Sequence, residues 1–151
     1  MTKPRLEKDF WVLVADGGRA LVLRNEGDEV YPNLQLVQKY EIENPPTRDQ
    51  GTDKPGRTND AFGNTSAVGQ TDWHQQAEDR FMQTLASDLA KKHEEGAFKS
   101  LIVAAPPTAL GALRKAESAN LKKAIVADIH KDWTHMPVYE IEQAVTKALA
   151  E

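Results

Sequence analysis

The chain has 151 residues, the usual size of a single domain, and it contains no cysteine, which excludes disulfides, thiolate metal sites and thiol nucleophiles. Its 19 lysines and arginines are outnumbered by 23 aspartates and glutamates, and the net charge of -4 excludes a whole-molecule attraction to nucleic acid or anionic lipid. The longest apolar runs, 10–15 and 101–105, are far too short to span a membrane and no export signal is visible, so we expect a cytoplasmic protein that binds neither a membrane nor DNA.

Three strands are predicted in the first 42 residues. A continuous apolar run at 10–15 is followed by Asp16-Gly-Gly18, whose residues tolerate the positive φ of a tight turn. Residues 19–24 return as a second strand, and Asn25-Glu-Gly-Asp28 supplies the next turn. Residues 34–42 alternate with period two, as in a strand with one face in water. An antiparallel meander is therefore expected.

A long polar loop, residues 44–71, is predicted to separate this meander from the first long helix. The apolar pattern stops there, and a structureless connection of this length inside a domain is usually functional or disordered. The pattern Asp72-x-x-Gln75 is typical of a helix start, and the helix should end near Gly96. Its apolar stripe recurs every four residues at Trp73, Ala77, Phe81, Leu85 and Leu89.

The second half of the chain alternates strands and helices. Strands are predicted at 101–105 and 124–129, with a helix at 106–117 between them, in which Gly111 is expected to permit close packing. A last helix begins at Pro137. Because strands joined through helices pair in parallel, the chain 1–151 is predicted to be one α/β domain with a mixed sheet of about five strands flanked by helices.

Four segments carry a resemblance to a known family. They are Trp11–Arg24, Thr52–Arg57, Ala104–Arg114 and Lys131–Thr134, and they resemble bacterial proteins described as required for attachment to host cells. The likeness extends along nearly the whole chain. That family is in turn similar to the middle domain of the class I release factors of archaea and eukaryotes. The resemblance implies a release-factor-like fold and a role in translation, with the ribosome or transfer RNA as partner.

The resemblance also points to Gly69 and Gln70 as catalytic candidates. Release factors carry a Gly-Gly-Gln motif where this chain reads Ser66-Ala-Val-Gly-Gln70. Hydrolysis of the peptidyl-tRNA ester needs a slender backbone, an N–H for the developing oxyanion and room for one water. Val68 replaces the first glycine, and a β-branched residue resists positive φ. We therefore expect a non-enzymatic role, with ester hydrolysis as the one activity in question.

Further binding candidates each have a plain structural alternative. Asp53 and Arg57 either clamp a phosphate or form a structural turn, and His74 is either an RNA contact or a surface residue near a helix start. The basic residues between 114 and 131 are either a local RNA contact or the solvated face of a helix. Neither a metal site nor a cofactor is predicted, because the four histidines lack ligand spacing and no phosphate-cradling glycine motif occurs. The basic candidates are Arg114, Lys115, Lys122 and Lys123.

Two functions from different classes follow from these residues. The first is a stand-alone translation-associated domain that contacts the ribosome or RNA. The alternative is a regulatory or protein-binding module that docks a partner through the 44–71 loop and acts on host attachment indirectly, from the cytoplasm. The oligomeric state is not indicated by the sequence.

Overall fold

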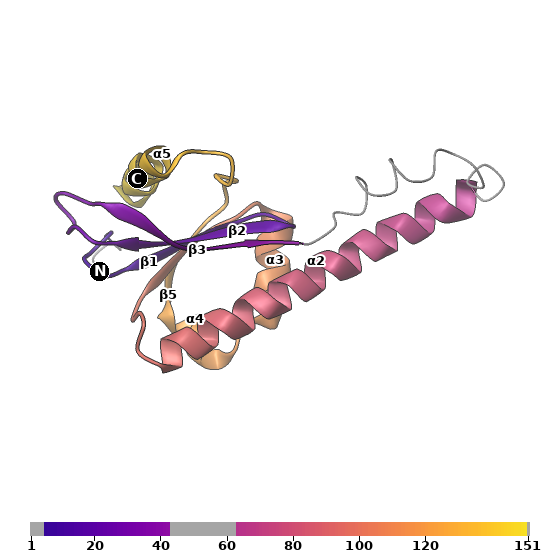
Figure 1. Ribbon diagram of the computed structural model, residues 1–151, viewed down its shortest axis with the longest axis horizontal. Helices are drawn as coiled ribbons and strands as arrows, with labels where there is room; N and C mark the ends of the chain where they lie inside the picture. The colour runs from indigo at the N-terminus through magenta and orange to yellow at the C-terminus, as the bar shows by residue number, and fades with distance from the viewer. Residues whose placement is uncertain (1–4, 43–62, 151) are drawn as a thin grey trace.

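The computed structural model describes residues 5–42 and 63–150, and for residues 63–74 the secondary structure without the side chains. The elements are labelled in Figure 1. They are β1 (Trp11–Ala15), β2 (Arg19–Asn25), β3 (Leu34–Glu41), α2 (Gly63–Glu94), β4 (Leu101–Ala104), α3 (Pro107–Ala116), α4 (Ala119–Ala124), β5 (Ile125–Ile129) and α5 (Val138–Ala150).

The five strands form one mixed sheet in the order β3-β2-β1-β4-β5. Strand β1 is central: it pairs antiparallel with β2 and parallel with β4. The β2–β3 pair is antiparallel and the β4–β5 pair is parallel. These pairings confirm the predicted meander, the alternation of strands and helices after it, and the α/β class.

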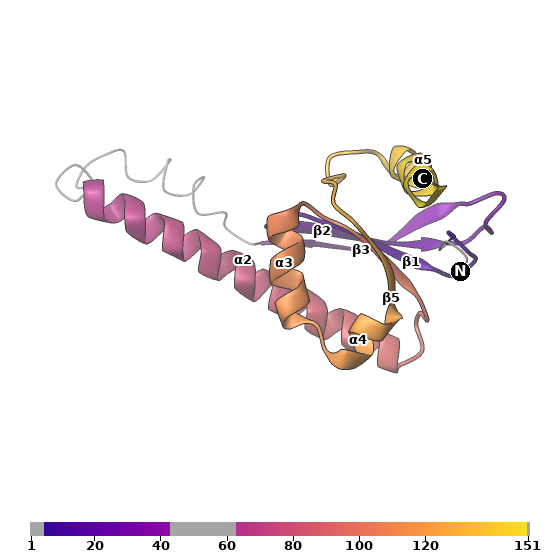
Figure 2. The ribbon, with the colours of Figure 1, turned by 180° about the vertical axis from the view of Figure 1, so that it is seen from behind.

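Helices cover the sheet unequally, with α2, α3 and α4 on one face and α5 on the other (Figures 1 and 2). Each face has its own core. Leu13 of β1 packs in the first core with Leu85 of α2, whereas Val12 packs in the second with Ile141 of α5 and Trp133. All five residues of β1 are buried. Burial on both faces explains why this strand reads as a continuous apolar run.

Helix α2 begins at Gly63, nine residues before the predicted start at Asp72. Residues 63–71 are therefore helical, and the predicted loop was too long at its C-terminal end; its other residues, 44–62, lie outside the described residues. The capping pattern at Asp72 and Gln75 was misleading, because both residue types also fit inside a helix. Once the C-terminal half of α2 packs on the sheet, each further residue adds a hydrogen bond without a new nucleation step.

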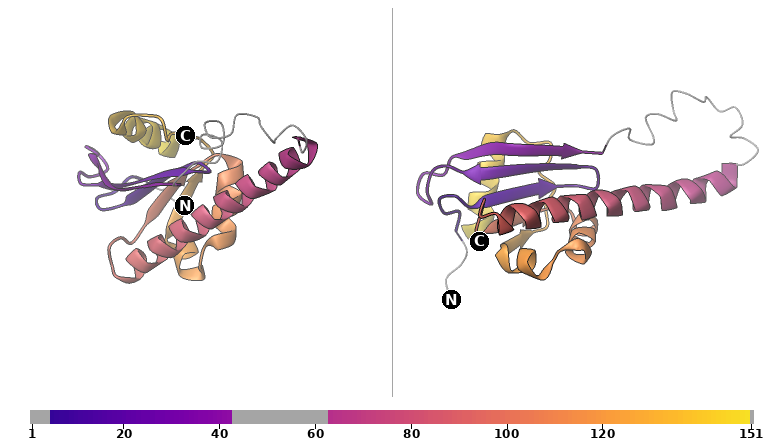
Figure 3. Two further views of the ribbon diagram at one scale, coloured as in Figure 1. Left: turned by 45° about the vertical axis from the view of Figure 1, so that its right-hand side comes forward. Right: turned by 60° about the horizontal axis from the view of Figure 1, so that its bottom comes forward.

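The first half of α2 projects beyond the sheet, while its second half passes beneath it (Figure 3). The C-terminal end of the helix closes at Gly96, which has φ +84°, with the N–H of Gly96 donating to His93 and that of Ala97 donating to Lys92. This pair of bonds is the Schellman arrangement, and it confirms the predicted helix end.

Two smaller expectations were wrong. The sequence prediction missed α4, a short helix whose first turn is capped by Ser118, with the Leu121 N–H donating to the Ser118 hydroxyl at 3.1 Å. Gly111 does not permit close packing, because a methyl group added there would meet open space. Within the described residues, no helix has the length and apolarity needed to cross a membrane.

Candidate functional site

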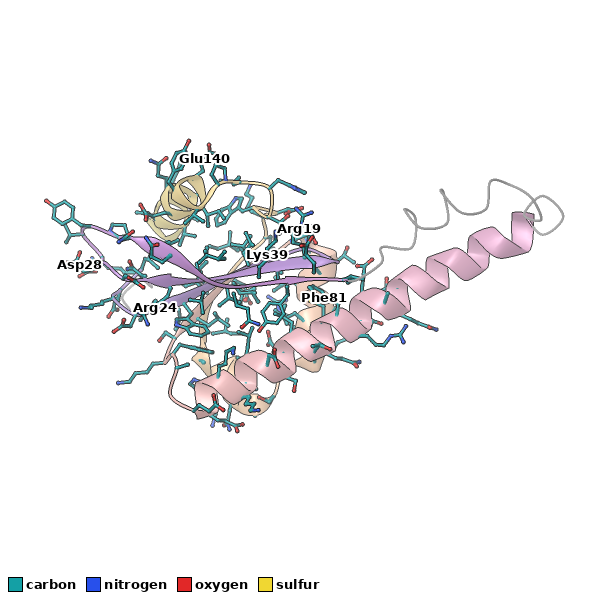
Figure 4. All side chains as sticks on the ribbon, in the orientation of Figure 1. Arg19, Arg24, Asp28, Lys39, Phe81 and Glu140 are labelled. Carbon is teal, nitrogen blue, oxygen red and sulfur yellow. The ribbon has the colours of Figure 1, made fainter. Side chains whose placement is uncertain are left out.

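A cluster of polar side chains lies at the end of the sheet from which α2 projects. Strand β1 ends here at Ala15, directly before Asp16, and β2 begins at Arg19, which Figure 4 labels at this end of the sheet. Asp16 Oδ1 accepts hydrogen bonds from the N–H groups of Gly18 and Arg19, both at 2.8 Å. The Asp16 N–H donates to the Arg19 carbonyl, also at 2.8 Å. The Asp-Gly-Gly turn is therefore fixed by its own aspartate.

The loop that follows β5 joins this turn through Thr134. The side chain is 5% exposed, and its hydroxyl lies 2.6 Å from Asp132 Oδ1 and 3.1 Å from Asp16 Oδ2. A hydroxyl has one hydrogen, so Thr134 donates to one of the two carboxylates at a time. Its backbone N–H donates to Asp132 as well, at 3.0 Å. One buried threonine thus holds together two loops that are 118 positions apart in sequence.

Arg19 supplies positive charge beside these carboxylates. Arg19 Nη1 lies 3.4 Å from His135 Nδ1, and Arg19 Nε lies 3.8 Å from the Glu41 carboxylate. Burial acts to raise the pKa of Asp132, but the hydroxyl and N–H of Thr134, together with nearby His135 and Arg19, lower it on balance. Asp132 is therefore an anion in a network that already contains its cation.

Three of these residues have the side chains of a metal site. Asp16, Asp132 and His135 each offer one ligand atom, and these atoms lie within 4.8 Å of one another. Carboxylate and imidazole ligands suit several divalent ions. The cluster could not be found from spacing along the chain, because only the pairing of β1, β4 and β5 brings the residues together. Arg19 adds positive charge at the same place, 3.4 Å from the same His135.

The cluster also forms the root of the projection. The Ile42 N–H, at the end of β3, donates to the Gly18 carbonyl at 2.9 Å, just before the chain leaves the described residues. From the other side, the Glu78 carboxylate of α2 occupies the space where a side chain at Gly17 would lie. The Asp16 turn therefore contacts both ends of the segment that runs from β3 into the projecting helix.

A hydrogen bond farther along the sheet fixes the direction of α2. The Tyr40 hydroxyl donates to Asp88 at 3.1 Å. Burial, and then the adjacent Asp88 charge, raises the pKa of Tyr40 to about 12, so the phenol keeps its proton for this bond. Phe81, labelled in Figure 4, lies partly buried where α2 passes under the sheet. Together these contacts hold the second half of the helix against the body.

The predicted catalytic residues lie in the projecting half of α2. Gly69 and Gln70 are inside the helix, as is Val68, whereas the prediction had placed them in a loop. His74 is on the same helix, and its side chain lies outside the described ones, the first of which along α2 is that of Gln75. Asp53 and Arg57 lie outside the described residues, so the phosphate clamp stays a prediction.

The predicted basic residues lie near the opposite end of α2. Arg114 and Lys115 are in the last turn of α3, and Lys122 and Lys123 are in the last turn of α4. All four are exposed. Arg114 donates to Asp128 at 2.8 Å, and this bond raises the pKa of the guanidinium. The fold therefore separates the predicted site residues into two groups at the two ends of one helix.

Comparison with solved structures finds proteins that resemble this chain over part of their own length. One is the archaeal translation termination factor aRF1, at 15% identity and a TM-score of 0.48, with 95% of this chain and 37% of that chain covered. Another is an archaeal protein at 15% identity and a TM-score of 0.47, with 92% and 33% covered. A third is Dom34 of S. cerevisiae, described as a translation termination-like factor that interacts with Hbs1, at 14% identity and a TM-score of 0.38, with 95% and 37% covered.

The chain thus spans about a third of the length of these structures. A comparison with curated proteins gives no match. Attachment to host cells is named by none of these findings, so that expectation stays a prediction. The family model described as bacterial archaeo-eukaryotic release factor family 12 matches residues 9–145, which is nearly the whole chain. The chain therefore belongs to this family of release-factor-like proteins.

Proposed function

We propose that this domain acts in translation by bringing the projecting half of α2 into contact with the ribosome or with a transfer RNA bound to it. Membership of a release-factor family over residues 9–145 supports the choice of translation. The observation that carries the proposal is the projection itself (Figure 3). A helix of 32 residues is about 48 Å long, and only its second half is needed to cover the sheet.

Where its side chains are described, from Gln75 on, the projecting half of α2 has little of the packing that normally stabilises a helix. Along α2, the first fully buried side chain among the described residues is Met82, whereas Gln75 and Gln76 are exposed. A helical segment of about 15 residues without tertiary contacts is marginally stable in water. A surface that receives this segment would stabilise it, and the polar cluster at its root would fix the direction in which it points.

The proposal assigns contact to Gly69 and Gln70, without ester hydrolysis. Beyond the first turn of a helix, each backbone N–H is directed at the carbonyl four residues earlier and is not free for an oxyanion. Val68 also stands where the motif would need its first glycine. We expect no peptidyl-tRNA release above the uncatalysed rate, and the Gln70→Ala variant should behave like the intact protein in that assay.

Cosedimentation with bacterial ribosomes at about 50 mM salt tests the contact. The informative variant is Gln70→Glu, which places a negative charge on the projection against anionic RNA. Gln76→Glu is the matched control, because it makes the same change on the same helix, nearer the body, at a side chain that is exposed. We expect Gln70→Glu to lose ribosome binding and Gln76→Glu to keep most of it.

Two results would count against the proposal. Absence of the intact protein from the ribosome pellet would remove the translation role and leave the protein-docking alternative. Equal behaviour of the two glutamate variants would remove the projection as the contact surface. Melting curves recorded for both variants ensure that a loss of binding is not a loss of folding.

A further inference from the structure

We infer that a groove between the C-terminal ends of α2 and α3 binds the phosphate backbone of RNA. The groove has a volume of about 600 Å³. Small side chains line it, among them Ala86 and Ala90 of α2 and Ala116 of α3, and one lysine stands on each helix, Lys91 and Lys115. Small residues leave room for a sugar-phosphate chain, and lysines on facing walls suit its repeating charge.

The charge of this surface is opposite to that of the molecule. The ends of α2, α3 and α4 meet at one end of the body (Figures 1 and 2). Together with the residues beside them they carry six lysines and arginines against four carboxylates, whereas the whole chain has a net charge of -4. A local positive surface on an acidic protein attracts a polyanion in one orientation only. The six cations are Lys91, Lys92, Arg114, Lys115, Lys122 and Lys123, and the carboxylates are Glu94, Glu95, Glu117 and Asp128.

Helix stability explains each basic residue singly but does not explain their convergence. Cations in the last turn of a helix are favoured by the helix dipole, and α2, α3 and α4 each have them there. That effect acts on each helix alone, however, and would be satisfied wherever the helix ended. The fold brings the end of α2 against the end of α3, so that Lys91 and Lys115 line the same groove.

The two groove lysines are available for a ligand. Arg114 is bound to Asp128 at 2.8 Å, but among the described residues Lys91 and Lys115 take part in no salt bridge. Both are exposed. One carboxylate, Glu94, also lines the groove. It would favour a ligand with separated phosphates, in preference to a ligand that presents negative charge continuously to both walls.

The choice of RNA rests on the proposed function, but the surface lies away from the projection. Lys91 is 21 positions after Gln70 on one continuous helix, so the two contacts are separated by about 32 Å. An RNA held in the groove and a ribosomal contact made by the projection would therefore be two distant contacts along one helix.

Fluorescence anisotropy over a salt series measures the binding of a mixed-sequence RNA duplex of about 20 base pairs, and it tests whether the groove binds RNA. The informative variant is Lys91→Gln with Lys115→Gln. The matched control is Lys8→Gln with Lys147→Gln, which removes the same charge from exposed lysines elsewhere. We expect the groove variant to bind roughly 10-fold or more weakly at about 100 mM salt, with a salt slope lower by about 2. The control should change binding less than about threefold.

The outcomes separate this inference from the proposed function. If the duplex does not bind at about 50 mM salt, or if both variants weaken binding equally, the groove inference is wrong, whatever the ribosome assay shows. If an oligo-glutamate peptide binds through Lys91 and Lys115 and the duplex does not, the partner is an acidic protein and the inference is overturned. If the duplex binds through the groove while the protein fails to cosediment with ribosomes, only the proposed function falls. Melting curves check that every variant is folded.

Discussion

The buried side chain of Asn25 offers the sharpest test of how the body is held together. It is 0% exposed at the end of β2. Its Nδ2 group donates to the carbonyls of Leu6 and Glu7, both at 3.0 Å, and its Oδ1 accepts from the N–H groups of Gly27 and Asn33, at 3.0 and 2.8 Å. One amide thus ties the N-terminal segment to the β2–β3 turn.

Replacement by leucine should be more damaging than replacement by alanine. Leucine fills the site with an apolar side chain, excludes water, and leaves two partly buried N–H donors unpaired at about 1–3 kcal/mol each, so we expect a loss of roughly 3–5 kcal/mol. Alanine leaves a polar space in which a water can take over some of the bonds, and a loss of about 2 kcal/mol is expected. A domain is commonly stable by only about 5–15 kcal/mol, so the Asn25→Leu protein should be marginal.

Urea unfolding gives the free energies directly. Trp11 and Trp133 are 5% and 9% exposed, so their fluorescence reports loss of the two cores. Agreement between fluorescence and circular dichroism would establish that unfolding is two-state. The reasoning is refuted if Asn25→Leu loses less than about 1 kcal/mol, or if Asn25→Ala is the less stable of the two.

Three further changes test single contacts. Gly27→Ala should lose about 2 kcal/mol or more of unfolding free energy in a urea titration, because the new methyl group would overlap the Tyr31 carbonyl oxygen. The matched control is Gly111→Ala, whose methyl group meets open space on a helix and should leave stability unchanged or raise it by up to about 1 kcal/mol. Similar losses in both variants would contradict this reasoning. Thr134→Val should lower stability by about 1–2 kcal/mol by removing the hydroxyl between two carboxylates, and an unchanged melting temperature would show that the hydroxyl does not hold the two loops together. Burial, and then the neighbouring Asp128 charge, raises the pKa of half-buried Glu117 above its ordinary value of 4.5. The contribution of Glu117 to stability is therefore complete below pH 4.5 and is lost as the pH rises through the pKa of the folded state. Glu117→Gln should therefore gain more stability relative to the intact protein at pH 7 than at pH 4, and a difference independent of pH would contradict the sign.

The sheet could be predicted because the burial of its strands is reflected in the pattern of apolar residues along the sequence. The run at Trp11–Ala15 is buried on both faces, and Leu101–Ala104 likewise. The start of α2 could not be predicted in the same way, since the capping pattern at Asp72 and Gln75 gave a false helix start. Helix α4 did have a signal, the Ser118 cap, but at six residues it is too short for an apolar period to show.

The polar cluster at the root of α2 was beyond sequence reasoning for a different reason. The turn at Asp16 was predicted, but its partners Asp132 and Thr134 lie more than a hundred residues later, and each reads locally as an ordinary loop residue. Lys91 was missed in the same way, because its relation to Lys115 exists only where α2 crosses α3. The predicted basic residues could be chosen from the local charge of the sequence, but Lys91, which lies across the groove from Lys115, could not.

The pairing of β1 with both β2 and β4 has a consequence for how this protein can change. Trp11 pairs with Arg24 close by in sequence and with Leu101 ninety positions away, so the hairpin can form before the chain between them is closed. The projecting half of α2 takes part in neither of these strand pairings. Its sequence can therefore change with little effect on the folding of the body, which makes it the natural place for exchanged sequences.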